Sequence, residues 1–396
     1  MIRKIAVTGT KGKSTTLRML ESGFRKLQYN VYGSYGIDGY YYNGDMVRSG
    51  HSCENYVDWN VEDMPTDVHL IEATSFVLQK DMLEHVELDC AIFTSFDKTE
   101  HQELHLEGDD YLSSKRKMFD LLKPGGKAVV CRDISDFHKV VENHESKVIT
   151  YGYHPDSDFV IDTHMLTNKK MIFSLNYEDN TVYFRTGMLG EFNALNMAAA
   201  YIACLQLEQD NILFFKGLEE FKGFPGRLER FFIPKTNNDI IIDYAHTPES
   251  MESILELIKN VYPDKDILTV FGCGGNKSKT KRPIMGKLAA QYSNFVVLTN
   301  DNPRSENPMD IINDILKGME GSEDFRIILD RSEAIKTCLS KGRNCVIAIL
   351  GKGAEDVMMF GEQEFYHNDK ICLIEWCYQN NLTLINTSHQ EKINEN

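Results

Sequence analysis

The sequence predicts an α/β fold with two successive domains, each built on a mostly parallel sheet. Short β-branched apolar runs alternate with helically periodic stretches from the N-terminus onward. This rhythm breaks over residues 147–187 and restarts after residue 239. Such alternation is typical of doubly wound sheets, in which ligands bind at the carboxyl ends of the strands.

In the first domain, RKIAVT (3–8) reads as a buried strand, and a helix follows it to about residue 27. A second helix is predicted over 109–122. The later strands are short, apolar and flanked by polar residues or glycine, which favours central parallel strands. They are VHLIEA (68–73), CAIFTSF (90–96) and KAVVC (127–131).

Residues 147–187 predict a small antiparallel edge sheet. Two alternating runs flank the turn Glu178-Asp179-Asn180, which is the pattern of a β-hairpin. Residues 193–207 then predict a helix with Asn193 as its N-cap.

A polar stretch with a proline, 233–239, predicts a domain boundary. We assign 1–234 to the first domain, 235–384 to a second, Rossmann-like α/β domain, and 385–396 to a frayed polar tail. Four apolar runs are the expected strands of the second domain: DIIIDYA, DILTVFG, NFVVLTN and NCVIAIL.

Composition excludes several classes of protein. The formal net charge of -16 argues against nucleic-acid or anionic-membrane partners. There is no apolar run of membrane-spanning length and no signal-peptide pattern. The nine cysteines form no C-x-x-C pair, which favours reduced core residues over zinc or disulfides. We expect a cytoplasmic monomer or weak oligomer with small-molecule partners.

VTGTKGKSTT (7–16) joins the first strand to the first helix and carries the residues of a phosphate-binding loop. Backbone N–H groups and the helix N-terminus favour phosphate there, Lys13 would reach the β- and γ-phosphates, and Ser14 would hold Mg²⁺. Two residues separate the glycines, whereas the common pattern has four. The ATP-binding residues predicted here are Gly9, Thr10, Lys11, Gly12, Lys13, Ser14 and Thr15.

Polar stretches follow four other predicted strands. Glu72 ends one strand, and His101 and His105 follow the next. DYAHTP (243–248) and GCGGNKSKTKRP (272–283) follow strands of the second domain. Taken singly, each stretch also fits an ordinary solvated loop.

Eight motifs in the same order make the chain resemble the Mur ligases, most closely the UDP-N-acetylmuramoyl-tripeptide synthetases of the MurE type. The motifs are TGTKGKST, FTSFDKTEHQELH with YLSSK, GEFNALNMAAA, FKGFPGRLER, DYAHTPESME, GCGGNKSKTKRPIMG, TNDNPRSENP and GKGAE. The first has the short glycine spacing of that family's phosphate loop. The resemblance implies a central ATPase-type domain with a phosphate loop, followed by a C-terminal Mur ligase domain.

The resemblance implies an ADP-forming amide ligase that activates a carboxylate as an acyl phosphate, which an amine then attacks. It implies ATP and two Mg²⁺ ions, with Lys13 neutralising phosphate charge. Ser14 and Glu72 would hold the first ion, and His101 the second with help from Lys115. Lys115 would be carbamylated by CO₂, because an anionic oxygen suits Mg²⁺ better than an ammonium.

Other ATP contacts follow from the same resemblance. Asn193 and Asn196 would lie near the adenine, and Asp243 would bind the ribose hydroxyls. Arg227, together with Lys281 and Arg282, would reach phosphate when the domains close, and this closure would exclude water.

The amino-acid pocket would be formed by the D-N-P-R and G-K-G-A-E stretches. Arg304 resembles the arginine found in the family members that add meso-diaminopimelate. A guanidinium can bind the distal carboxylate of that amino acid with two hydrogen bonds. Glu355 would take the distal ammonium. The predicted pocket residues are Asp301, Asn302, Arg304, Gly351 and Glu355.

The chain departs from the family pattern at Lys11, Ser95, Asn276 and Ala354, where asparagine, asparagine, aspartate and histidine are usual. It also begins at the phosphate loop, so we expect it to lack the N-terminal domain that binds the UDP-sugar. Poly-γ-glutamate, folate-like or other γ-glutamyl carboxylates are therefore alternative acceptors, bound by residues 30–60. A non-catalytic nucleotide-binding partner protein is the alternative of another class.

Overall fold

The computed structural model describes residues 2–35, 39–48, 64–97, 108–142, 147–208, 212–389 and 391–393. It forms two compact units, Met1–Phe221 and Lys222–Asn396. The sequence placed the boundary later, at 234/235.

The described residues of the first unit form one mixed sheet in the order β11-β10-β9-β8-β7-β6-β1-β5-β2-β3-β4. Its strands are β1 (Arg3–Thr8), β2 (Val31–Tyr35), β3 (Gly39–Tyr42), β4 (Asp45–Arg48), β5 (Val68–Glu72), β6 (Leu88–Phe93), β7 (Leu122–Cys131), β8 (Val148–Gly152), β9 (Phe159–Leu166), β10 (Met171–Tyr177) and β11 (Asn180–Thr186).

The centre of this sheet is parallel, as the sequence predicts. β1 lies between β5 and β6 and pairs in parallel with both. The buried runs along all three strands leave the sheet without a solvent face there. The three strands therefore end at one edge, which brings the residues after Thr8, Glu72 and Phe93 together.

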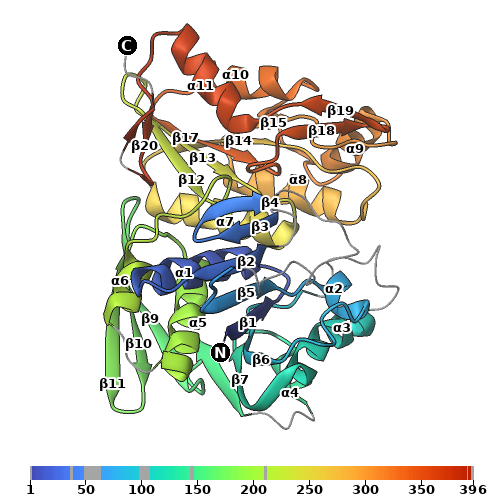
Figure 1. Ribbon diagram of the computed structural model, residues 1–396. Coiled ribbons are helices and arrows are strands. Elements are labelled where there is room, and N and C mark those ends of the chain that lie inside the picture. Colours follow the sequence, from blue (N-terminus) through green and yellow to red (C-terminus); the bar gives the residue numbers. More distant parts are fainter. Residues whose placement is uncertain are drawn as a thin grey trace. The chain divides into compact units, whose positions relative to one another are not determined.

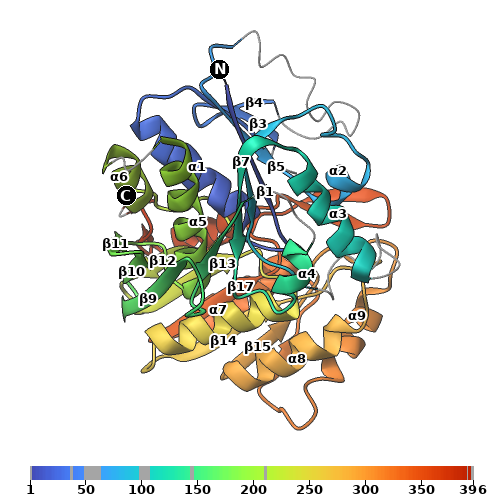
Figure 2. The same ribbon diagram turned by 90° about the horizontal axis from the view of Figure 1, so that it is seen from below.

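Helices cover both faces of the sheet (Figures 1 and 2). One face carries α1 (Lys13–Lys26), α5 (Glu191–Glu208) and α6 (Ile212–Glu219). The other carries α2 (Ser75–Gln79), α3 (Gly108–Asp120) and α4 (Phe137–Val141).

The predicted cap of α5 is wrong. The helix begins at Glu191, before Asn193, whose Nδ2 donates to the carbonyl of Leu189 at 2.8 Å. Gly190 (φ +94°) makes the turn that lets the helix start earlier.

The predicted edge hairpin is confirmed: β10 and β11 pair antiparallel around Glu178, which has φ +49°. A second antiparallel edge, β2-β3-β4, was not predicted.

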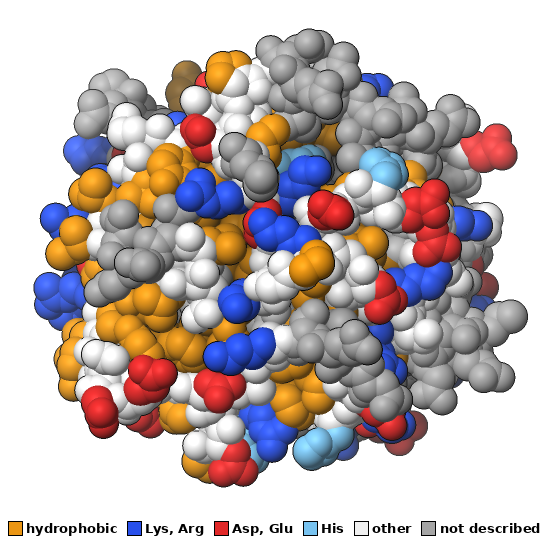
Figure 3. All heavy atoms as spheres, turned by 60° about the horizontal axis from the view of Figure 1, so that its bottom comes forward, with side chains coloured by type: hydrophobic (Ala, Val, Ile, Leu, Met, Phe, Trp, Pro, Cys, Tyr) orange, Lys and Arg blue, Asp and Glu red, His pale blue; other side chains and the backbone are white. Residues whose placement is uncertain are grey.

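Figure 3 shows hydrophobic side chains gathered toward the left of that view, with basic and acidic side chains interspersed elsewhere. Exposed hydrophobic residues of this unit include Tyr183 on β11 and Ile212 on α6.

The second unit has a sheet in the order β16-β15-β14-β17-β13-β12-β20-β21. Its strands are β12 (Glu229–Ile233), β13 (Asn238–Asp243), β14 (Asp266–Phe271), β15 (Phe295–Leu298), β16 (Phe325–Ile327), β17 (Cys345–Leu350), β20 (Ile385–Asn386) and β21 (Glu391–Lys392). A separate hairpin joins β18 (Val357–Phe360) to β19 (Gln363–Tyr366).

Helices lie on both faces of this sheet as well (Figure 1). They are α7 (Pro248–Val261), α8 (Lys281–Tyr292), α9 (Pro308–Leu316), α10 (Arg331–Lys341) and α11 (Asp369–Gln379). The four predicted strands are confirmed as β13, β14, β15 and β17, which run parallel.

The expectation of a frayed tail is wrong for the described residues after Leu384. β20 pairs antiparallel with β12 and with β21. Thr387 N–H also donates to the carbonyl of Arg230 at 2.9 Å. Because β12 would otherwise be a sheet edge, the polar segment gains backbone partners that its composition does not reveal.

The described cysteines are all buried and free, as the sequence predicts for core residues. None of the helices in the described ranges is long and apolar enough to cross a membrane.

Replacing Ile347, a fully buried residue of β17, tests the core of the second unit. Ile347→Ala should lower the free energy of unfolding by about 2–5 kcal/mol, because a cavity remains in a packed sheet. Urea denaturation would measure the free energy of unfolding. Hydrogen exchange of peptides that cover β13, β14 and β17 would measure the same loss within the sheet. The control is Tyr366→Ala, at a side chain that is 73% exposed, which should change the free energy of unfolding by less than about 0.5 kcal/mol. Equal losses of stability in the two variants would contradict the assignment of Ile347 to the core.

Candidate active site

The predicted phosphate loop runs from β1 into α1 and needs both of its glycines. Gly9 and Gly12 have φ angles of +147° and +85°. A Cβ at Gly9 would overlap the hydroxyl of Thr94, and one at Gly12 would overlap the carboxamide of Asn196. The short loop is therefore packed against two other segments of the first unit.

Two lysines meet at the carbonyl oxygen of Gly9. Lys13 Nζ donates to it at 3.1 Å and Lys115 Nζ at 2.8 Å. Lys115 is fully buried and lies 4.6 Å from the ring centroid of Tyr111. Burial, reinforced by the charge of Lys13, holds the pKa of Lys115 well below its usual range, although Glu72 opposes the shift. No feature of the sequence indicates the burial of Lys115.

The predicted metal ligands Ser14 and Glu72 are in contact. Ser14 Oγ donates to Glu72 Oε2 at 3.1 Å, and Lys13 Nζ lies 3.9 Å from Glu72 Oε1. A hydroxyl and a carboxylate are the hard oxygen donors that Mg²⁺ prefers, so these residues fit a magnesium ion. His101 and His105 lie outside the described residues. Within the described part of the chain, no three His, Cys, Asp or Glu residues gather as a metal site.

Residues that follow β6 form hydrogen bonds with the phosphate loop. Ser95 Oγ accepts from Lys11 N–H at 2.8 Å and donates to the Lys11 carbonyl at 3.0 Å. Thr94 Oγ1 donates to the same carbonyl at 2.5 Å. Lys11 and Ser95, two departures from the family pattern, are therefore in direct contact.

Thr10 has side-chain partners that the sequence did not indicate. Its Oγ1 lies 3.2 Å from the hydroxyl of Tyr111 and accepts from Asp97 N–H at 3.0 Å. Tyr111 and Lys115 lie one helical turn apart on α3, so one face of that helix contacts the loop. The spacing of Tyr111 and Lys115 was visible in the sequence, but the packing of α3 against the loop was not.

Asn193 and Asn196 lie buried at the base of the loop. Asn196 Oδ1 accepts from Thr16 Oγ1 at 3.3 Å, and its Nδ2 donates to Asn193 Oδ1 at 3.4 Å. The structure thus gives both residues contacts that support the start of α1. Their contact with adenine stays a prediction.

In the second unit, Asp243 is buried at the end of β13. Its carboxylate accepts from Leu228 N–H at 2.7 Å and Ala245 N–H at 2.8 Å. Burial raises the pKa of Asp243, and the charge of Arg227 opposes the shift. Arg227 lies over the ring of Tyr244, 4.4 Å from its centroid. The ribose and phosphate roles of Asp243 and Arg227 stay predictions.

Lys281 and Arg282 differ in their surroundings. Lys281 Nζ donates to the carbonyl of His246 at 3.0 Å. The Arg282 side chain is fully buried and pairs with Glu306 at 2.8 Å and with Asp314 at 3.0 Å. Arg282 thus joins the loop after β14 to α9 and the turn before it, and its contact with phosphate on domain closure stays a prediction.

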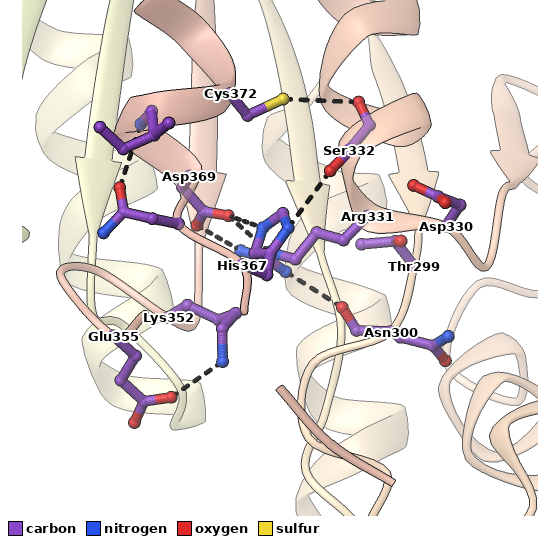
Figure 4. A network of polar contacts seen from close by, with 12 residues as sticks. Thr299, Asn300, Asp330, Arg331, Ser332, Lys352, Glu355, His367, Asp369 and Cys372 are labelled. Carbon is purple, nitrogen blue, oxygen red and sulfur yellow. Dashed lines mark hydrogen bonds and ion pairs between the residues drawn. The ribbon is translucent and has the colours of Figure 1, made fainter. Parts of the chain in front are cut away.

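The two predicted amino-acid loops meet through a lysine that the sequence analysis did not single out. Lys352 is fully buried, and its Nζ donates to Glu355 Oε2 at 3.0 Å and Asn302 Oδ1 at 3.3 Å. Asn302 Nδ2 also donates to Glu355 Oε2 at 3.0 Å. Figure 4 shows Lys352 and Glu355 facing each other on their loop. The position of Lys352 in the G-K-G-A-E stretch was the only feature of the sequence that pointed to this residue.

Arg304 and Asp301 complete the predicted pocket. Arg304 has φ +52°, and its Nη1 donates to the carbonyl of Gly275 at 2.9 Å. Burial raises the pKa of Asp301, against the charges of Arg331 and Lys352. A Cβ at Gly351 would lie 2.7 Å from Asp301 Oδ2, so the two loops are in close contact. Asp301 and Asn302 of one loop thus contact Gly351 and Glu355 of the other, whereas the Arg304 side chain contacts Gly275.

Family models cover most of the chain. The Mur ligase middle domain matches residues 7–204, and the Mur ligase glutamate ligase domain matches residues 226–353.

Individual relatives agree with these models. The UDP-N-acetylmuramoyl-L-alanyl-D-glutamate–2,6-diaminopimelate ligase of Alkaliphilus oremlandii is 31% identical over 394 residues, covering 94% of this chain and 78% of that protein. The enzyme of the same name from Bacteroides thetaiotaomicron is 32% identical over 387 residues, covering 94% and 77%.

Solved structures show the same fold. A diaminopimelate ligase of that name is 26% identical with a TM-score of 0.64, covering 96% of this chain and 79% of the other. Folylpolyglutamate synthase from Mycobacterium tuberculosis reaches a TM-score of 0.74 at 16% identity, covering 88% of each chain, which shows the fold alone. The chain belongs to the Mur ligase family and carries its middle domain followed by its glutamate ligase domain.

Proposed function

We propose that the protein is an ATP-dependent, ADP-forming ligase that joins an amino acid, of the diaminopimelate type, to an acceptor carboxylate in peptidoglycan precursor synthesis. The observation that carries this is the cluster of Lys13, Ser14, Glu72 and Lys115 around one short glycine loop. It combines phosphate-binding cations with oxygen ligands, which a phosphoryl transfer between two anions requires. The relatives' names supply the acceptor and amino acid.

The residues of the first unit would position and neutralise the phosphates. Backbone N–H groups of the loop and the N-terminus of α1 would receive phosphate oxygens, and Lys13 would turn from the Gly9 carbonyl toward the γ-phosphate. Mg²⁺ bound by Ser14 and Glu72 would screen the charge that develops during transfer. The acceptor carboxylate gains the phosphoryl group, ADP leaves, and the amine then displaces phosphate to form the amide.

Lys115 would serve as a carbamate. Its neutral amine adds to CO₂ and loses a proton, which gives an N-carboxylate. The lowered pKa of Lys115 favours the neutral amine that this reaction needs. An anion at this place would also turn the repulsion by Lys13 into attraction, and it would supply an oxygen ligand for a second Mg²⁺ with His101.

Arg304 and Glu355 would select the amino acid. Arg304 would bind the distal carboxylate in a bidentate pair, and Glu355 the distal ammonium. Glu355 already accepts from Lys352 and Asn302, and these contacts orient its carboxylate before the amino acid binds.

The ligase activity is tested with purified protein, ATP, Mg²⁺, bicarbonate, an amino-acid panel and two acceptors, UDP-MurNAc-dipeptide and a γ-glutamyl peptide. We expect phosphate release only when acceptor and amino acid are both present. The productive pair identifies the acceptor. Nucleotide binding without release for any pair would contradict the ligase and favour a nucleotide-binding partner protein.

The carbamate is tested with Lys115→Ala. Turnover should fall by about 100-fold or more, since a metal ligand is lost. The ¹³C NMR carbamate signal of protein equilibrated with ¹³C-bicarbonate should also disappear. The control is Lys117→Ala on the same helix, where the exposed lysine pairs with Asp81. A persistent signal, or full activity of Lys115→Ala, would show that the role is wrong.

Selection of the amino acid is tested with Arg304→Met. The KM for meso-diaminopimelate should rise by roughly 10–100-fold, while the KM for ATP stays within about twofold, because a charge-assisted pair is lost. Arg326→Ala, at an exposed arginine of β16, is the matched control. An unchanged preference between diaminopimelate and lysine would assign the distal carboxylate to another residue.

A further inference from the structure

Arg331 and Asp369 form a fully buried ion pair in the second unit. Arg331 is the first residue of α10, and Asp369 is the first residue of α11. The guanidinium donates from Nε to Asp369 Oδ1 at 2.8 Å and from Nη2 to Oδ2 at 2.7 Å. This bidentate geometry, drawn in Figure 4, fixes the plane of the guanidinium.

The other contacts of Arg331 go to the backbone in front of the two amino-acid loops. Nη1 donates to the carbonyl of Asn300 at 3.3 Å, and Nη2 to the carbonyl of Leu350 at 3.0 Å. Asn300 directly precedes Asp301–Arg304, and Leu350 directly precedes Gly351–Glu355. One side chain therefore binds the base of both loops.

The Arg331 side chain connects two loops that the sheet itself does not join. The loops follow β15 and β17, and β14 lies between these strands. No ladder hydrogen bond can therefore join β15 to β17 directly. Gly272, after β14, has no side chain there, and a Cβ would overlap the carbonyl of Thr299. The loop after β15 thus passes close over the end of β14, within reach of Arg331.

We propose that Arg331 is a positioning residue for the incoming amino acid, because its pair with Asp369 sets the spacing between the loops Asp301–Arg304 and Gly351–Glu355. The identity of these loops as the amino-acid pocket rests on the proposed function. The loop spacing itself rests on the contacts above.

The charges around the pair support this role. Burial raises the pKa of Asp301, and the charge of Arg331 is the first of the two that oppose it. Burial would also raise the pKa of Asp369, but the charge and hydrogen bonds of Arg331 outweigh it and hold that pKa below its usual range. One guanidinium thus compensates two buried carboxylates, and one of them belongs to the pocket.

His367 fixes the orientation of Asp369 from the other side. Its Nε2 lies 2.8 Å from Asp369 Oδ1, and its Nδ1 lies 3.3 Å from the hydroxyl of Ser332, the neighbour of Arg331. Figure 4 shows the imidazole between the starts of the two helices. A lysine at 331 could not reproduce the planar set of contacts, because its donors radiate from one atom.

The test uses a variant that removes both charges. In Arg331→Met/Asp369→Leu, apolar side chains replace the buried pair, so neither partner of the pair is left as an unpaired charge, and Lys352 remains to compensate Asp301. We expect the KM for the amino acid to rise by roughly tenfold or more, with the KM for ATP within about twofold. Arg331→Lys should recover only part of the loss. The control is Leu339→Ala, a fully buried core residue on the same helix, which should lower Tm without this split.

Hydrogen exchange of the unliganded full chain gives a readout that needs no ligase activity. Peptides covering 299–304 and 350–355 should exchange faster in the double variant, relative to the rest of the second unit, than in Leu339→Ala. Unchanged exchange in both peptides would overturn the inference whatever the activity. Faster exchange with an unchanged amino-acid KM would overturn the positioning role. If the wild type lacks amino-acid-dependent phosphate release, the proposed function fails, and exchange alone then decides whether Arg331 sets the loop spacing.

Discussion

Two lysine side chains share the carbonyl oxygen of Gly9, and the arrangement of the first unit around the loop depends on this contact. Lys13 comes from α1 and Lys115 from α3, which cover opposite faces of the sheet. The complete burial of Lys115 raises the cost of its charge, and repulsion by the nearby ammonium of Lys13, which is 15% exposed, adds to that cost. The lowered pKa of Lys115 is the consequence. Glu72 between the strand ends is the compensating anion, and the same carboxylate fits the metal.

The second unit solves a similar problem in a different way. Its loops also follow parallel strands, but two buried arginines there form ion pairs: Arg331 with Asp369, and Arg282 with Glu306 and Asp314. Pairing fixes these guanidinium groups in place, whereas Lys115 lies beside a second ammonium group and has a lowered pKa. Each unit thus places buried cations beside the loops that follow its parallel strands, which fits the phosphate and amino-acid roles proposed for those loops.

The central parallel strands of both sheets were predictable because β-branched apolar runs and glycine loops are local signals, whereas the edge strands β2-β3-β4 and β20-β21 were not predicted. The contact between Ser14 and Glu72 was expected from the resemblance to the Mur ligases, and the shared edge at which the parallel strands end explains it physically. Contacts that depend on distant packing were not predictable. Arg331 was not singled out in the sequence, and Arg282, in a basic stretch, was expected to reach phosphate, although both side chains are buried in ion pairs. Ser95 was noted only as a departure, although it holds the loop through both backbone groups of Lys11.

The strands that begin and end the second unit lie side by side. β12 is its first strand, and β20 pairs with it near the end of the chain, with β21 beyond. The ends of the unit therefore meet in one sheet, and only a short linker would be needed to join them. This is the geometry that circular permutation requires. The exposed turn at Gly361 between β18 and β19 offers a place for new termini that interrupts none of the strands of the main sheet.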